Sequence, residues 1–128
     1  MRKVILMTLL FIMSSSATAE WAKVGSNEKA TIYVDSSSIQ RKGKMAKMWH
    51  LVDFITPKKD MGEEYMSTKD QNEYDCNEKK LRRRAFSEHS KNMGGGDVVY
   101  SDSFTTKWSE VTPESGIQIL WETACGKR

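Results

Sequence analysis

The sequence of 128 residues contains only two cysteines and two histidines. It has no Gly-x-Ser-x-Gly elbow and no cluster resembling a catalytic triad, which argues against hydrolases of those classes. The glycine run at 94–96 is followed by neither Lys-Ser nor Lys-Thr, so it predicts a turn rather than a phosphate-binding loop. We therefore expect a protein that is not an enzyme and has no cofactor, although a cleft visible only in coordinates would reopen the question.

Long apolar runs are also missing, since none reaches the roughly 20 residues of a membrane-spanning helix. The longest, residues 4–13, follows two basic residues and precedes a stretch rich in serine and alanine. This order predicts a signal peptide over residues 1–19, cleaved after Ala19. An uncleaved anchor is the alternative, which the short run disfavours. No cysteine lies near the cut, so we expect the domain 20–128 to be exported to the periplasm or cell surface without an N-terminal lipid or a transmembrane span.

Opposite charges nearly balance in the exported part. The full chain has 20 basic and 17 acidic residues, and the signal peptide would remove two of the basic ones. A near-neutral exported domain is a poor candidate for nucleic-acid binding, and we expect no such partner. Its length suits one domain with a single core, in which a covalent cross-link would contribute much of the stability.

Cys76 and Cys125 both belong to the exported part, where the surroundings are oxidising. Two thiols permit one intramolecular bond, and closing a loop of about 50 residues would stabilise the domain by roughly 4 kcal/mol. The alternative is a reactive thiol, which usually has a second cysteine at Cys-x-x-Cys spacing or a neighbouring histidine and acid. Neither cysteine has such neighbours in the sequence, so we predict a structural disulfide.

Segments rich in β-branched and aromatic residues alternate with turn residues along the rest of the chain. Strands are expected at 30–35 and 45–55, in a hairpin between 65 and 90, and at 97–104. The segment 45–55 is apolar on both faces, which places it in the middle of its sheet. A single helical turn is expected at 35–39, where aspartate and serine side chains can cap backbone amides.

The C-terminal segment has the clearest helical pattern. One apolar stripe recurs at i, i+3, i+4 and i+7 and is made by Ile117, Leu120, Trp121 and Ala124, extended by Cys125. Thr112 is the expected N-cap, Pro113 the first helical residue, and Gly126 the end of the helix. Together the segments predict an α+β fold, with an antiparallel sheet of about five to six strands and a C-terminal helix tied to it by the disulfide.

The order of several short motifs resembles the surface-adhesin E family of Gram-negative bacteria. The motifs are Trp-Ala-Lys-Val at 21–24, Tyr-Val-Asp-Ser-Ser-Ser-Ile at 33–39, Trp49, Ser-Thr-Lys at 67–69, Glu-Tyr-Asp-Cys at 73–76, the arginines at 82–84, Val-x-Pro-Glu-Ser at 111–115, and Ala-Cys at 124–125. The resemblance spans the mature chain and implies the same fold, surface exposure, and binding to host matrix or plasma proteins such as vitronectin, laminin and plasminogen. The named adhesin is a lipoprotein, whereas this chain has no lipidation cysteine.

A run of basic residues follows the first cysteine. The candidate binding patch consists of Lys79, Lys80, Arg82 and Arg84. Strand alternation would place Arg82, Arg84 and Phe86 on one face and Arg83 on the other. Exposed, these cations could bind sulfated glycans, anionic lipid or acidic protein surfaces.

The alternative for the basic run is pairing across the hairpin. Acids such as Glu73 and Asp75 precede the run and would face it from the neighbouring strand. Such pairing is a common result for opposite charges on adjacent strands, and we favour it for the arginines.

His50 and His89 are the only histidines, and each lies on a predicted strand. A metal site would require both to meet a carboxylate such as Asp53 or Glu88, so we expect no metal site. Two functional hypotheses remain: an exported binding module, or a periplasmic structural or envelope protein without a host partner. Cell fractionation would separate them.

Overall fold

The computed structural model of the protein describes residues 20–127, so the expected signal peptide, residues 1–19, lies outside the described residues. The strands form one antiparallel seven-stranded sheet, in which β1 to β6 are neighbours in chain order and β7 pairs with β5. The strands are β1 Trp21–Ser26, β2 Ala30–Lys42, β3 Met45–Asp60, β4 Glu63–Asp75, β5 Lys80–His89, β6 Val98–Asp102 and β7 Ser109–Glu110. This order needs only short turns between neighbours, as antiparallel pairing allows.

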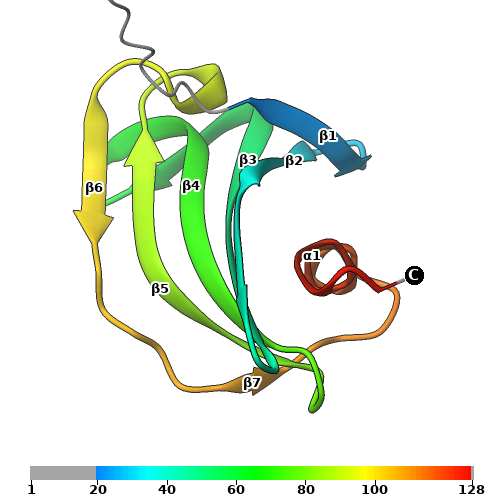
Figure 1. Ribbon diagram of the computed structural model, residues 1–128. Helices are drawn as coiled ribbons and strands as arrows, with labels where there is room; N and C mark the ends of the chain where they lie inside the picture. The colour runs from blue at the N-terminus through cyan, green and yellow to red at the C-terminus, as the bar shows by residue number, and fades with distance from the viewer. Residues whose placement is uncertain (1–19, 128) are drawn as a thin grey trace, which may run out of the picture.

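The sheet is strongly curved, and the single α-helix of the described residues, α1 (Gly116–Cys125), lies on its concave face (Figure 1). β3 lies in the middle, as its apolar character on both faces predicted. Met48 and Leu51 are both fully buried on it, on opposite faces. Met48 belongs to the cluster beneath α1. On the convex face, Leu51 is approached by Gly94 of the short 3-10 helix η1 (Asn92–Gly94).

The prediction of a helical turn at residues 35–39 was wrong. Strand β2 continues through this segment, with a shift in register between Asp35 and Gln40. The Asp35 carboxylate accepts a hydrogen bond from the backbone N–H of Ser37 at 3.1 Å. The Ser38 hydroxyl donates to the Asp35 carbonyl and accepts from the N–H of Trp49 at 2.9 Å. The polar side chains therefore replace ladder bonds across a bulge instead of capping a helix.

Helix α1 begins three residues later than expected, with Ser115 rather than Thr112 as its N-cap. The Ser115 hydroxyl accepts a hydrogen bond from the N–H of Gln118 at 3.3 Å and donates one to the Thr112 carbonyl at 2.6 Å. Thr112 therefore supports the cap from outside the helix. Gly126 ends the helix in the left-handed conformation, with φ of 68°, as expected.

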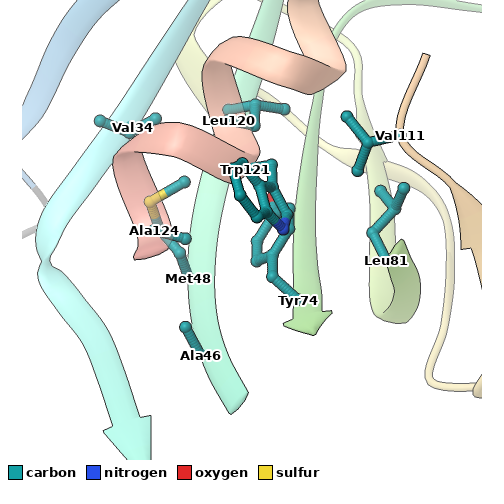
Figure 2. Close-up of a cluster of buried hydrophobic side chains, with 9 residues drawn as sticks. All are labelled: Val34, Ala46, Met48, Tyr74, Leu81, Val111, Leu120, Trp121 and Ala124. Carbon is teal, nitrogen blue, oxygen red and sulfur yellow. The ribbon is translucent and has the colours of Figure 1, made fainter. Parts of the chain in front are cut away.

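The core lies between α1 and the concave face, as Figure 2 shows. Its buried members are Val34, Ala46, Met48, Tyr74, Leu81, Val111, Leu120, Trp121 and Ala124. The predicted apolar stripe of the helix supplies the last three. The indole N–H of Trp121 donates to the Asp75 carbonyl at 2.9 Å, so the largest side chain of the helix is buried without an unpaired donor.

The predicted disulfide is present between Cys76, in the turn from β4 to β5, and Cys125, in the last turn of α1. It joins residues 49 positions apart. The expected α+β fold, with a C-terminal helix tied to an antiparallel sheet, is therefore confirmed. Among residues 20–127, none of the helices has the length and apolar character that crossing a membrane requires.

Breaking this bond should destabilise the domain substantially. A Cys76→Ser/Cys125→Ser variant should lose about 4 kcal/mol of unfolding free energy, because the unfolded chain regains the entropy of a loop of about 50 residues. Urea denaturation with and without a reducing agent measures the loss. Reductant should lower the midpoint of the wild type and leave that of the double serine variant unchanged. Equal midpoints for all four samples would contradict a stabilising role for the bond.

Candidate functional site: a basic strand face and a buried glutamate

Strand β5 carries its arginines on both faces of the sheet. Its register with β4 shifts between Gln71 and Asn72, which makes Arg84 the extra residue of a β-bulge. Alternation resumes beyond the bulge, so that Phe86 lies on the concave face with Arg83, whose guanidinium stands 4.2 Å from the Phe86 ring centre. The expectation that Phe86 shares a face with the patch arginines was therefore wrong.

Arg82 and Arg84 lie on the convex face and share one carboxylate, that of Glu73. The Arg82 Nη2 atom is 2.8 Å from Glu73 Oε1, and the Arg84 Nη1 atom is 3.2 Å from the same oxygen. Burial opposes ionisation of this carboxyl, but hydrogen bonds from both arginines hold the pKa of Glu73 below its usual value. The cross-strand pairing favoured from the sequence is present. Because two cations meet one anion, a positive charge remains.

Trp108, which no spacing in the sequence connects with this patch, stacks against Arg82. The Arg82 guanidinium carbon lies 4.4 Å from the centre of the Trp108 ring. Trp108 precedes β7 and reaches β5 only because β7 pairs with the start of that strand. Side-chain exposure is 29% for Arg82 and 36% for Arg84, so both guanidinium groups remain accessible.

The two lysines of the predicted patch separate. Lys80 lies opposite Asp75 on β4 and Glu110 on β7, and alternation places it on the convex face with Arg82. Lys79 turns towards the helix instead, and its Nζ lies 5.2 Å from the Trp121 ring centre. The structure thus brings Lys80, Arg82, Arg84 and Trp108 together, and we call these four residues the Arg82–Trp108 patch. Lys79 lies at its margin.

The two histidines cannot share a ligand. His50 lies opposite Asp70 on β4, and His89 lies opposite Ser67 on the same strand. Asp70 and Ser67 are three residues apart, so alternation puts them, and the histidines paired with them, on opposite faces. Within residues 20–127, no three His, Cys, Asp or Glu side chains are placed to hold a metal ion.

An acid pair, in which Glu88 is buried and Asp60 is partly exposed, lies near the far end of β5, and no pattern in the sequence indicated it. Glu88 is only 4% exposed. Its burial, together with the hydrogen bond and the negative charge of neighbouring Asp60, raises the pKa of Glu88 to about 7. The pKa of Tyr65 is raised by burial and by both carboxyl groups. Asp60 approaches Glu88 because the β3–β4 hairpin curls past β5 towards β6 (Figure 1), a contact that no spacing in the sequence indicates.

The sequence profile described as surface-adhesin protein E matches residues 21–126. The chain belongs to the surface-adhesin protein E family. The family resemblance inferred from the motifs is thereby confirmed. Membership in the family supports the interpretation that this is a surface adhesin-like protein. A search of curated proteins found no significant match in sequence.

Solved structures of Haemophilus influenzae protein E have a similar fold. One is 13% identical in sequence, with 87% of each chain covered and a TM-score of 0.64. The structure of crystal form II is 12% identical and covers 86% of this chain and 97% of that one, with a TM-score of 0.61. The structure from the non-typeable bacterium is 13% identical and covers 82% and 74%, with a TM-score of 0.59. At this identity the likeness shows that this member of the surface-adhesin protein E family shares their fold.

The Glu88 carboxyl should make stability depend on pH. Its pKa in the folded state, about 7, lies above the ordinary value of 4.5. Its stabilising contribution is therefore fully present below pH 4.5 and is lost as the pH rises through 7. Relative to wild type, Glu88→Gln should gain unfolding free energy on the order of 2 kcal/mol between pH 5 and pH 8.

Urea denaturation of both proteins across this range gives the difference, in which the titration of Asp70 and His50 cancels because both proteins retain these groups. Glu64→Gln, at an exposed position of the β3–β4 hairpin, serves as the control and should differ from wild type by a constant amount. A difference for Glu88→Gln that does not change with pH would refute the assignment.

Proposed function

We propose that the protein is an exported, non-enzymatic binding module that contacts acidic surfaces of host matrix or plasma proteins through the Arg82–Trp108 patch. The observation that carries the proposal is the shared carboxylate of Glu73. Two partly exposed guanidinium groups are held there by a single acid, and one of them is stacked on a tryptophan. Membership in the surface-adhesin protein E family supports a role at the cell surface.

The composition of the patch suits recognition of a protein. Arginine and tryptophan are enriched among the residues that dominate binding energy at protein interfaces. Each guanidinium has five N–H donors, so contact with Glu73 leaves donors that can pair with an acidic partner. Because Glu73 and Trp108 already restrain Arg82, less side-chain entropy is lost when a partner binds.

Removing both arginines should weaken binding to vitronectin or laminin. In Arg82→Ser/Arg84→Ser, the dissociation constant should rise about tenfold, which corresponds to about 1.4 kcal/mol. Wild-type binding should also weaken as salt rises from 50 to 300 mM, because the attraction between exposed charges is screened. Surface plasmon resonance with the purified exported protein measures both effects.

A matched control removes the same charge elsewhere. Lys23→Ser/Lys29→Ser changes two exposed lysines, one in β1 and one directly before β2, and lowers the net charge equally. This variant should bind nearly as wild type. Equal losses in the two double variants would show that only net charge matters, and unchanged binding in the arginine variant would eliminate the patch as the contact surface.

The location of the protein distinguishes this role from that of a periplasmic structural protein. A surface adhesin should be cleaved when intact cells are treated with protease, while a periplasmic marker in the same cells survives. Recovery of the whole protein with the periplasmic fraction, uncleaved, would favour the structural role.

A further inference from the structure

A pocket of about 340 Å³ lies on the concave face, beside helix α1. Arg82 of the Arg82–Trp108 patch also lines it, but the Arg82 guanidinium is paired with Glu73 and stacked on Trp108. Its walls include His50 on β3, Asp70 on β4 and Arg83 on β5, with Ile117 and Leu120 of the helix opposite them. Ile117 is 37% exposed, which places it at the rim. The volume is at the lower end of the range of about 300–1,000 Å³ for sites that bind small molecules.

Two residues that line this pocket each carry a buried polar atom without a hydrogen-bond partner. The two atoms are Nδ1 of His50 and Nε of Arg83, and the residues described in the structure contain only one other such side-chain atom, in Glu88. His50 as a whole is 6% exposed. Buried polar groups in native proteins are nearly always paired, so two unpaired groups in one pocket point to a ligand that pairs with them.

The charges of the pocket select the chemistry of that ligand. Burial lowers the pKa of His50 to about 4, so the imidazole is neutral at pH 7. Burial raises the pKa of Asp70 to about 6, against the opposing charge of Arg83, so this carboxyl is ionised at pH 7. A bound anion would therefore meet Asp70, and a bound cation would meet Arg83. A neutral group that both donates and accepts hydrogen bonds satisfies both.

The remaining walls also fit such a group. The hydroxyls of Thr106 and Ser109 and the amide of Asn72 add groups that donate and accept. The aliphatic side chains of Ile117 and Leu120 provide an apolar surface on the helix side. A sugar ring combines these properties, because its edge carries neighbouring hydroxyls and its faces expose C–H groups.

We propose that this pocket binds one neutral sugar unit, either as a free monosaccharide or as the terminal residue of a glycan. Asp70 and Arg83 bind adjacent hydroxyls, His50 pairs with a third polar group, and the C–H face of the ring lies against the helix. The inference goes beyond the proposed function and does not depend on it, because Asp70, Arg83 and His50 lie outside the Arg82–Trp108 patch, and Arg82 alone borders both.

The test uses NMR on the purified exported protein with a panel of neutral hexoses, deoxyhexoses and N-acetylhexosamines. We expect saturation-transfer signals from at least one sugar, with a millimolar dissociation constant. The ¹⁵N resonance of His50 Nδ1 should shift on addition of that sugar, which a merely structural histidine would not do. Comparing the free sugar with the same sugar at the end of an immobilised glycan tells which source binds better.

Two variants locate the site. Asp70→Asn keeps the shape of the side chain and should weaken sugar binding about tenfold, and Arg83→Gln should do the same. The control Glu63→Gln makes the same acid-to-amide change at an exposed position of β4 and should bind as wild type. The amide spectrum of each variant verifies folding, so that a lost saturation-transfer signal reports loss of sugar binding rather than unfolding.

Three outcomes would overturn the proposal. They are the absence of binding across the whole panel, unchanged binding in both Asp70→Asn and Arg83→Gln, and a preference for acidic sugars over neutral ones. Binding to vitronectin or laminin is measured separately with the Lys80→Ser/Arg84→Ser variant, which changes two residues of the Arg82–Trp108 patch and none that lines the pocket. This variant should keep its sugar binding. Failure of the sugar site and failure of the proposed function are thereby distinguished.

Discussion

The attachment of helix α1 at one corner of the sheet is the constraint on which the rest of the structure depends. Cys125 is bonded to Cys76, and the Trp121 indole donates to Asp75, so both contacts hold the helix to the end of β4 and the turn that follows. A helix of ten residues is too short to be stable alone in water. Fixed in this way, it covers the apolar part of the concave face and leaves the neighbouring polar part open.

Strand β5 connects the two proposed binding surfaces. Its convex side presents Arg82 and Arg84, held by Glu73, to the solvent. Its concave side turns Arg83 towards the pocket, with Phe86 beneath the guanidinium. A run of like charges in the sequence is thus divided by the geometry of the strand into one exposed pair and one recessed cation, which have different neighbours and can serve different partners.

The features that could be predicted from the sequence depend on local periodicity or on simple counting. The central position of β3, the apolar stripe of the helix and the pairing of two cysteines are of this kind. The N-cap was misplaced because Thr112 and Ser115 are both good capping residues, and the choice depends on the hydrogen bond between them. The contacts of Arg82 with Trp108 and of Glu88 with Asp60 join segments that meet only through β7 pairing and sheet curvature. The periodicity of the sequence contains no information about either.

The bulge at Arg84 has a consequence for how such a domain can change over evolutionary time. Arg84 is the unpaired residue of β5, so its removal would leave every later residue of the strand on its present face. Arg83 would still line the pocket, and Glu88 would still face Asp60. An insertion or deletion elsewhere in the strand would turn the following side chains over. Half of the exposed guanidinium pair therefore occupies a position that a single-codon event can add or remove while the interior stays unchanged.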